Sequence, residues 1–278
     1  MIWRTPALEF DLSTRALIMG VLNVTLNSFS DGGKFVTVNS ALVHARAMAA
    51  EGARVIDIGG ESTRPGAEPV PEQIEKERVL PVVEAVAKIP GVVVSIDTSK
   101  ASVARAAMEL GAAIVNDVTG LRGDPMMIEV VKETGAGVVV MHMQGSPRDM
   151  QIQPRYDDVV GEIREFFRQS FERVLASGID PTRVVFDPGI GFGKTVAHNL
   201  QLLKNFEALR VSDRPLAVGV SRKSFIGKLV ETDDIPRRDA ATAALTAMLR
   251  GKGANIFRVH AVRPNSDALR LAEAILAS

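Results

Sequence analysis

Short runs of valine and isoleucine alternate with longer stretches rich in alanine, leucine, glutamate and arginine along the whole chain. Continuously apolar short runs are typical of parallel strands that are buried on both faces. They predict strands at residues 17–22, 55–58, 92–96, 113–115, 138–141, 184–186, 216–218 and 256–259. Apolar residues recur at helical spacing between the runs, which predicts helices at residues 40–50, 72–88, 101–110, 156–176, 199–209, 237–250 and 266–276.

The order of these elements indicates the fold. A strand followed by a helix recurs about eight times, with no linker and no change of composition, which favours a closed (β/α)8 barrel, the TIM barrel fold. The chain of 278 residues is long enough for one such barrel, so we expect a single domain over residues 1–278. A doubly wound open sheet built from the same elements is the alternative.

Polar residues follow almost every predicted strand. They are Asn23, residues 59–64, Asp97 and Thr98, Asn116 and Asp117, His142, Asp187, residues 221–223 and residues 258–260. In parallel α/β folds the carboxyl ends of the strands meet at one rim, where active sites lie. Solvated turn residues would explain one or two of these positions, but not a whole ring. The pattern therefore predicts a functional site at this rim.

Composition limits the class of function. The 33 lysines and arginines balance 33 aspartates and glutamates, which argues against a protein built mainly to bind nucleic acid or an anionic membrane. No apolar run approaches the roughly 18 residues of a membrane span, and the first residues lack the pattern of a signal peptide. With no cysteine there is no disulfide, thiolate nucleophile or cysteine zinc site. We expect a cytoplasmic protein.

Residues 189–195 read Gly-Ile-Gly-Phe-Gly-Lys-Thr and invite comparison with phosphate loops. A P-loop needs its first glycine where this chain has Pro188, and in a dinucleotide motif the third glycine would come one residue later. We interpret the segment as a mobile glycine-rich lip that brings Phe192 and Lys194 to the mouth of the barrel. A flexible turn that caps the next helix is the alternative.

Three aspartates, Asp57, Asp97 and Asp187, lie within or just after predicted strands. A carboxylate in a barrel mouth can accept paired hydrogen bonds from the N–H groups of a 2-aminopyrimidinone ring. It can also act as a general base or bind a metal ion, whereas a cap on the following helix is the structural alternative. For the set as a whole we favour a functional role.

Basic residues gather after the seventh and eighth predicted strands. Residues 221–224 read Ser-Arg-Lys-Ser, and Arg258 and His260 are two apart, so on a strand they point the same way. Phosphate sites in barrels often lie at this edge. It suits an anionic ligand, most simply a diphosphate, unless Arg258 and His260 form structural ion pairs with carboxylates.

The sequence also contains candidates for metal binding. Asn23 and the acids could hold Mg²⁺ through oxygen atoms, whereas no pair of histidines has zinc spacing. For His142, a ligand-binding and a packing role are equally supported.

Residues 23–33 form a long polar stretch that ends in glycines, which predicts a lid. Phe29 is its large apolar residue and could stack on a ligand.

In eight segments the chain closely resembles the dihydropteroate synthase family. The segments are MGVLNVT and SFSDGG (residues 19–33), DIGGESTRPGA (57–67), VSIDT (94–98), IVNDVTG (114–120), VVMHMQG (139–145), DPGIGFGK (187–194), GVSRKSF (219–225) and RVH (258–260). They cover every predicted strand end in order. The resemblance implies a condensation of 6-hydroxymethyl-7,8-dihydropterin diphosphate with p-aminobenzoate that gives 7,8-dihydropteroate and diphosphate. It also implies Mg²⁺ as cofactor and a homodimer formed through helices late in the chain.

The resemblance further implies roles for individual residues. The pterin would be held by Asp97, Asn116, Met141, Asp187, Gly219 and Lys223. The diphosphate would be held by Asn23, Thr63, Arg258 and His260, with Asn23 also binding Mg²⁺. The aminobenzoate pocket would be formed by Phe29, Thr63, Arg64, Pro65, Phe192, Lys223 and Ser224. Catalysis would depend on Asp97, Lys223, Arg258, His260 and Asp31.

The chain departs from the family pattern at three positions. Leu26 and Asn27 stand where the family usually has Pro-Asp, and Ala261 stands where an acid usually follows Arg-Val-His. We expect an intact pterin site, with lid closure and aminobenzoate affinity affected. No insertion stands beside Phe29 or Phe192, so we expect sulfonamides to bind. A non-catalytic pterin-binding paralogue and a methyltetrahydrofolate-type methyltransferase are the alternative functions.

Overall fold

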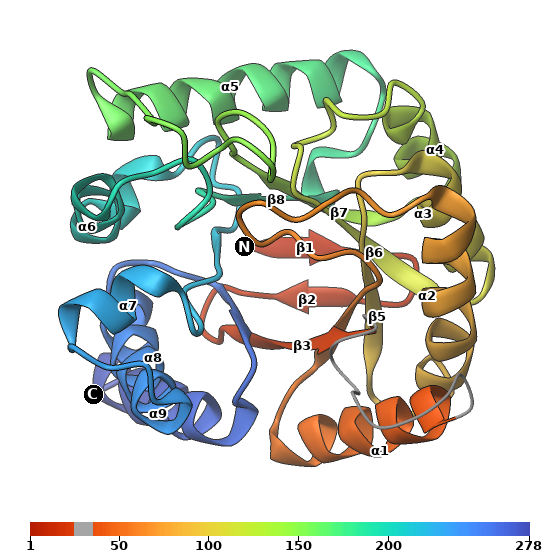
Figure 1. The fold of residues 1–278 in the computed structure, drawn as a ribbon, viewed down its shortest axis with the longest axis horizontal. Coiled ribbons are helices and arrows are strands. Elements are labelled where there is room, and N and C mark those ends of the chain that lie inside the picture. The colour runs from red at the N-terminus through yellow and green to blue at the C-terminus, as the bar shows by residue number, and fades with distance from the viewer. Residues whose placement is uncertain (25–35) are drawn as a thin grey trace.

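The apolar runs form the strands of one parallel sheet in the computed structural model, which describes residues 1–24 and 36–278 (Figure 1). The strands are β3 (Leu17–Asn23), β4 (Val55–Gly59), β5 (Val93–Asp97), β6 (Ala112–Asp117), β7 (Gly137–Met141), β8 (Val184–Asp187), β9 (Ala217–Val218) and β10 (Ile256–Val259). Their order is β8-β7-β6-β5-β4-β3-β10-β9. A parallel bridge between Phe186 and Leu216 joins the two ends of this series. The sheet is therefore closed, which confirms the barrel and excludes the open doubly wound sheet.

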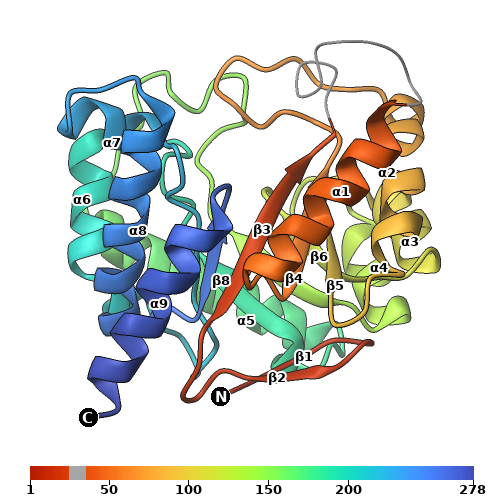
Figure 2. The same ribbon diagram turned by 90° about the horizontal axis from the view of Figure 1, so that it is seen from below.

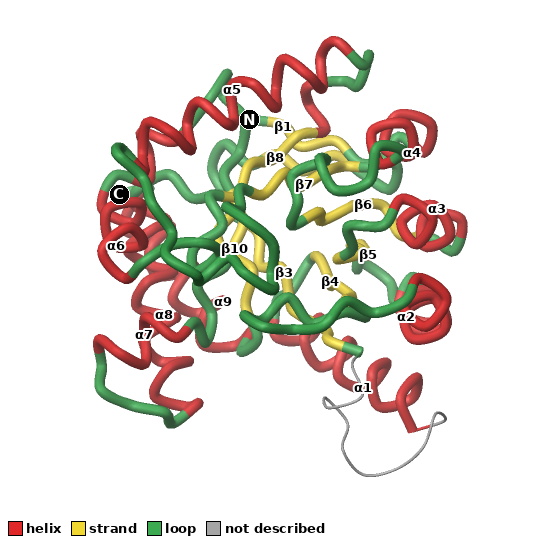
Figure 3. Tube along the Cα trace, turned by 45° about the horizontal axis from the view of Figure 1, so that its top comes forward, coloured by secondary structure: helices red, strands yellow, loops and turns green. Residues whose placement is uncertain are grey.

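Helices surround the strands as an outer ring (Figure 3). They are α1 (Val36–Glu51), α2 (Glu72–Val86), α3 (Ala101–Glu109), α4 (Met127–Thr134), α5 (Val159–Ala176), α6 (Val196–Lys204), α7 (Ser224–Leu229), α8 (Ile235–Gly251) and α9 (Val262–Leu276). None of the described helices is long and apolar enough to cross a membrane.

The helix predictions failed at three places. Helices α4 and α7 were not predicted, because eight and six residues are too few to show a clear helical period. The helix predicted at residues 199–209 is instead α6 followed by the short 3-10 helix Phe206–Leu209. The break falls at Asn205, whose φ of −108° and ψ of 32° leave the helical region.

Side chains alternate between two apolar layers along each strand. Ile56 and Ile58 of β4 pack outward in the cluster between strands and helices, whereas Val55 packs inside the barrel with residues such as Val93 of β5. Because side chains on a strand point to opposite faces in turn, Asp57 also faces inward. The barrel interior is therefore apolar where the strands begin and becomes polar towards their carboxyl ends.

An N-terminal hairpin closes the apolar end of the barrel (Figure 2). Strands β1 (Ile2–Arg4) and β2 (Glu9–Asp11) pair antiparallel, and were not predicted because three residues are too few for a period. Trp3 is fully buried and stacks on Phe10, with ring centroids 5.6 Å apart. Its indole Nε1 donates a hydrogen bond to the carbonyl of Arg183 over 2.9 Å. The hairpin thus completes the lower core.

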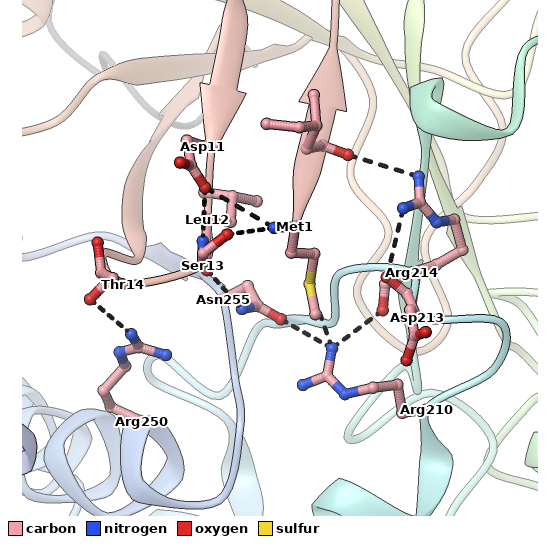
Figure 4. A network of polar contacts seen from close by, with 11 residues as sticks. Met1, Asp11, Leu12, Ser13, Thr14, Arg210, Asp213, Arg214, Arg250 and Asn255 are labelled. Carbon is pink, nitrogen blue, oxygen red and sulfur yellow. Dashed lines mark hydrogen bonds and ion pairs between the residues drawn. The ribbon is translucent and has the colours of Figure 1, made fainter.

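Arginines hold the hairpin against the underside of the barrel (Figure 4). Arg210 Nη1 donates to the Oδ1 of Asn255 over 3.3 Å and to the carbonyl of Arg214 over 3.1 Å. Arg214 Nη1 donates in turn to the carbonyls of Ile2 (3.4 Å) and Pro181 (2.9 Å). The guanidinium groups therefore satisfy backbone carbonyls that the hairpin and the neighbouring loops would otherwise leave buried without donors.

We expect Trp3→Ala to lower the free energy of unfolding by about 3–5 kcal/mol, as large-to-small changes in a packed core do. The measurement is urea denaturation followed by circular dichroism, because the chain's single tryptophan is lost in the variant. Glu9→Ala on the exposed face of the hairpin is the control, and it should change stability by under about 1 kcal/mol. A loss below about 1 kcal/mol for Trp3→Ala would show that the hairpin is not part of the core.

Candidate active site

The polar layer of the barrel is built around one buried carboxylate. Asp57 of β4 is fully buried, and its Oδ1 accepts a hydrogen bond from Ser95 Oγ over 2.6 Å. Its Oδ2 accepts from Asn116 Nδ2 over 3.0 Å and from Arg258 Nε over 2.6 Å. Strands β5, β6 and β10 each supply one of these donors. Asp57 therefore fixes the side chains that surround it.

Arg258 connects this layer to the mouth of the barrel. Its Nη2 lies 2.6 Å from Asp97 Oδ2, so one guanidinium pairs with Asp57 and Asp97 together. Burial acts to lower the pKa of Arg258, but the two carboxylates outweigh it and raise the pKa above its ordinary value. The ion pairs that the sequence left as an alternative are thus present for Arg258.

Asp97 ends β5 close to Asn23 of β3. A Cβ on Gly59 would lie 3.4 Å from the Cβ of Asp97 and 3.7 Å from the Oδ1 of Asn23, so these two side chains lie on either side of Gly59. Burial raises the pKa of Asp97 to about 7, with Arg258 opposing the rise and Asp57 adding to it. Asp97 therefore changes charge near neutral pH.

Lys223 lies on the opposite side of the mouth. Its Nζ is 3.8 Å from the centre of the Phe192 ring, a favourable cation–π position. A Cβ on Gly191, whose φ is 82°, would lie only 3.2 Å from the Cδ of Lys223, so glycine lets the lysine pass. Burial and Arg258 lower the pKa of Lys223 to about 8, against the opposing charges of Asp187 and Asp97.

Asp187 and Met141 complete this side of the mouth. Asp187 Oδ1 accepts a hydrogen bond from the N–H of Gly189 over 2.7 Å, and burial raises the pKa of its carboxyl group. Met141 at the end of β7 belongs to a small apolar cluster with Val118, Met143, Met150 and Phe192. The structure thus joins a buried acid to an apolar surface on which a flat ligand could pack.

His260 follows β10 and is oriented by Ser221. The N–H of His260 donates to Ser221 Oγ over 3.1 Å, and the His260 Nδ1 lies 3.0 Å from the same oxygen. The hydroxyl proton is then free to point at Nδ1, which places the ring proton on Nε2. Burial and Arg258 lower the pKa of His260 to about 3. His260 is therefore neutral and offers an N–H donor.

Arg222 and Ser224 flank Lys223 in the β9–α7 loop. Arg222 has a left-handed φ of 59° and donates to both carboxylate oxygens of Asp239 on α8, over 2.8 and 2.7 Å. A bidentate arginine–carboxylate pair of this kind fixes geometry as well as charge. Ser224 is the exposed first residue of α7.

Thr63, Arg64 and Pro65 lie in the loop that follows β4. The carbonyl of Arg64 accepts from the N–H of Ala67 over 3.0 Å, and Gly66 has a φ of 78°, which together form a type II turn with proline in its favoured position. Arg64 and Pro65 are exposed, and Thr63 is half-buried.

The base of this loop is tied to α2 and to the loop after β5. Lys100 Nζ pairs with Glu61 of the β4 loop and, over 2.5 Å, with Glu75 of α2. The Glu75 side chain is almost completely buried. This triad was not predicted, because neither charge pattern nor spacing relates residues so far apart along the chain.

Lys194 does not reach the mouth, contrary to our interpretation of the glycine-rich segment. Its Nζ is buried and donates to the carbonyl of Phe192 over 2.8 Å, with His142 Nδ1 at 3.1 Å. Burial lowers the pKa of Lys194 to about 7 and that of His142 to about 2. The His142 ring packs edge-on against Phe166 at 5.0 Å. The packing role is therefore the one that the structure supports for His142.

Some predicted positions cannot be compared with the structure. Phe29 and Asp31, together with the departures at Leu26 and Asn27, lie outside the described residues. The predicted lid, residues 23–33, also lies outside the described residues, apart from Asn23 and Val24.

Ala261, the third departure, is the N-cap of α9 and provides no side-chain cap. Glu51 at the end of α1 takes over this role, because its Oε2 accepts from the N–H of Arg263 over 3.1 Å. Asn265 Nδ2 also donates to the carbonyl of Ala261 over 2.7 Å. The start of α9 is thus held by contacts from Glu51 and Asn265.

Neither Ser95 nor the specific role of Asp57 was predicted, and Ser221 was predicted only as part of the rim. Asp57 interrupts an apolar strand, which was a usable signal, whereas Ser95 carried none. Among the described residues, no group of three histidines, aspartates or glutamates could hold a metal ion. Cation binding at this mouth would therefore depend on a few oxygen donors together with a ligand's own oxygens.

Comparison with known proteins bears on what this mouth binds. Residues 19–260 match the family model described as "Pterin binding enzyme". The dihydropteroate synthase of Escherichia coli (strain K12) is 44% identical over 263 residues, which are 94% of this chain and 92% of that relative. The Yersinia pestis dihydropteroate synthase, solved in a sulfonamide drug complex, has a TM-score of 0.93 at 44% identity and covers both chains fully.

A second solved structure shows the same likeness. The Xanthomonas albilineans dihydropteroate synthase with 4-aminobenzoic acid has a TM-score of 0.91 at 41% identity, over 97% of this chain and 96% of that one. The family match spans all eight strands of the barrel and the residues at its mouth. The chain belongs to the pterin-binding enzyme family and, within it, to the dihydropteroate synthases.

Proposed function

We propose that the chain joins 6-hydroxymethyl-7,8-dihydropterin diphosphate to p-aminobenzoate, giving 7,8-dihydropteroate and diphosphate, as a transferase of folate biosynthesis in the cytoplasm. The pairing of Arg258 with both Asp57 and Asp97 at the barrel mouth carries the proposal. A cation suited to a diphosphate thus lies directly beside a carboxylate suited to the reacting pterin, which supports the proposal. The sulfonamide and 4-aminobenzoic acid in the related structures support the second substrate.

The pterin ring is proposed to lie between Asn116 and Asp187 and to pack on Met141. The ring offers adjacent N–H donors, which suit a carboxylate, and a carbonyl, which suits the ammonium of Lys223. Gly219 is proposed to lie beside the ring, because a Cβ placed there would point to the side chain of Arg258, 3.8 Å from its Cβ.

The reaction then needs no protein nucleophile. The bond between the pterin methylene carbon and the diphosphate oxygen breaks, the electron pair leaves with the diphosphate, and the nitrogen of aminobenzoate forms the new bond and loses a proton. Asp97 stabilises the positive charge on the pterin, and Arg258 with the N–H of His260 stabilises the departing diphosphate. Arg258 pairs with Asp97 before the reaction. When Arg258 moves towards the diphosphate, the carboxylate of Asp97 becomes free to stabilise the pterin cation.

Asn23 is the proposed protein ligand for Mg²⁺, and Thr63 a further contact to the diphosphate. The Asn23 Oδ1 lies on the Asp97 side of Gly59 and is the kind of oxygen donor that Mg²⁺ prefers, with substrate phosphates supplying most other ligands. When bound, the ion would neutralise charge on the leaving diphosphate.

The aminobenzoate pocket is proposed to form between the loops that follow β4, β8 and β9. Phe192 and Lys223 make one side, and the exposed turn of Arg64 and Pro65 makes the other, with Thr63 and Ser224 at the edge. Phe29 and Asp31, from the segment predicted as a lid, are proposed to complete the pocket and to support catalysis. Sulfonamides are expected to compete for this position.

A homodimer is proposed through the last three helices. Large apolar side chains are exposed on them: Leu229 of α7, Ile235 and Met248 of α8, and Leu271 and Ile275 of α9. Apolar surface gathered in this way is typical of interfaces between protein chains.

The first test is diphosphate release from the purified protein supplied with the pterin diphosphate, p-aminobenzoate and Mg²⁺. We expect release to require both substrates and to be inhibited by a sulfonamide in competition with p-aminobenzoate. Asp97→Asn should lower kcat by about 10²-fold or more, because an electrostatic group at the reacting centre is removed while its shape is kept. Pterin binding by calorimetry without any release from the wild-type chain would instead identify a non-catalytic paralogue.

The second test is the pH dependence of kcat/KM for the pterin diphosphate. Activity needs Asp97 ionised and Lys223 protonated, so it should fall about tenfold per pH unit below about 7 and again above about 8. Lys223→Arg should remove the alkaline limb and keep the acid limb, because arginine stays protonated. A wild-type profile that is flat between pH 6 and 9 would contradict these assignments.

The third test is the mass of the protein in solution by light scattering. The wild-type chain should have the mass of two chains, and Ile235→Asp with Leu271→Asp should shift it towards one chain by placing charges in the apolar interface. Val43→Asp on the exposed face of α1 is the matched control and should leave the mass unchanged. A monomeric wild-type protein would rule out the dimer.

A further inference from the structure

We propose that the segment between β7 and α5, residues 142–158, is a brace that holds two sides of the aminobenzoate pocket at a fixed separation, with Tyr156 as its main positioning residue. The inference rests on the function proposed above. One side of the pocket, the glycine-rich wall, is residues 189–194 after β8. The other, the β4 wall, is residues 63–67.

The brace binds the backbone of the glycine-rich wall. Three successive carbonyls, those of residues 191, 192 and 193, each accept a hydrogen bond from a side chain. The donors are Gln151 Nε2 (2.7 Å), Lys194 Nζ (2.8 Å) and Tyr156 Oη (2.9 Å). Gln151 and Tyr156 belong to the brace, and Lys194 is itself bonded to His142 of the brace.

These bonds matter because the wall has little stiffness of its own. Gly189, Gly191 and Gly193 all have positive φ values, of 63°, 82° and 63°, and glycine has the widest choice of backbone conformation. A Cβ on Gly193 would lie 2.5 Å from the carbonyl oxygen of Gln144, so the wall and the brace are in close contact. The position of Phe192 is therefore set by the brace.

The brace also binds the β4 wall. The carbonyl of Pro147 accepts from the N–H of Gly66 over 3.1 Å, at the turn that presents Arg64 and Pro65. Asp149 shapes this end of the brace, because its Oδ1 accepts from both the N–H and the hydroxyl of Ser146 over 2.6 Å.

Hydrogen bonds within the brace join residues near its two ends. Gln144 Nε2 donates to the carbonyl of Arg155 over 2.9 Å, and the N–H of Arg155 donates back to Gln144 Oε1 over 3.1 Å. Met150 is buried in the cluster that contains Met141 and Phe192. Loops that follow β4 and β8, which are not neighbours in the sheet, are thus connected through one folded segment.

Tyr156 is suited to this role. It is the chain's only tyrosine, and its ring packs edge-on against His198 at 5.0 Å and beside His142 at 6.0 Å. Burial raises the pKa of its hydroxyl group, so the hydroxyl stays protonated and remains a donor. The hydrogen bond of Tyr156 ends on the carbonyl of Gly193, whereas Asp97, Asn116 and Asp187 stand on strands and accept no side-chain hydrogen bond from the brace. The brace meets the pterin side through the backbone bond from His142 to Asp187 and through the packing of Met150 with Met141, which Tyr156→Phe leaves in place. That variant should therefore act on aminobenzoate binding and leave pterin binding unchanged.

The test compares the wild-type protein with Tyr156→Phe, Asp149→Ala and a control, Arg148→Ala. Tyr156→Phe keeps the ring contacts and removes one hydrogen bond, so the KM for p-aminobenzoate should rise about fivefold. The Kd of the pterin diphosphate, by calorimetry, should stay within about twofold of wild type. Asp149→Ala should raise the same KM by acting on the β4 wall. Arg148 is exposed in the same segment, and its variant should match wild type.

Hydrogen exchange gives an independent readout without substrates. Amides of residues 189–194 should exchange faster in Tyr156→Phe, and those of residues 64–67 faster in Asp149→Ala. An unchanged KM for p-aminobenzoate in Tyr156→Phe, or an equal loss of pterin affinity, would overturn the brace while leaving the proposed function intact. A wild-type chain that binds no p-aminobenzoate would refute the proposed function, and this inference with it.

Discussion

The buried ion pair between Asp57 and Arg258 is the interaction on which the mouth of this barrel depends. Both oxygens of Asp57 are already bonded, to Ser95, Asn116 and Arg258, so the carboxylate is stabilised only while those donors stay in place. Removing one partner of such a pair leaves a buried charge unpaired, which typically costs about 3–5 kcal/mol. The same contacts that keep the charge stable therefore also fix the positions of Asn116 and Arg258.

The barrel separates stability from chemistry along its axis. Where the strands begin, Trp3 and the hairpin seal an apolar layer that contains Val55 and Val93. Two residues further along the same strands, Asp57 and Ser95 begin the polar layer. Polar groups beside a sealed core have no water to bond, so they must bond to one another. The polar layer around Asp57 is therefore held together by hydrogen bonds within the protein.

The sequence predicted the strands and the rim well because both follow from local rules. A strand that is buried on two faces must be apolar throughout, and the polar residue that ends it marks the mouth. Lys194 was misplaced because its burial depends on a turn back to the carbonyl of Phe192 in its own segment and on His142, which another loop contributes. The hydrogen bonds from Gln151 and Tyr156 to residues 191 and 193 join segments about 40 residues apart, and no periodicity records such contacts. The role of Ser221 was missed for the same reason.

The charges gathered at the mouth fit the two demands of the proposed reaction, at the leaving group and at the reacting carbon. Among the described groups that meet there, Asp57, Asp97 and Asp187 face the cations Arg258 and Lys223, and His260 is neutral. Carboxylates outnumber cations among these groups, and Asp57 adds to the rise in the pKa of Asp97 to about 7 that burial produces. In the reaction proposed above, this negative charge would stabilise the pterin cation once the diphosphate has left.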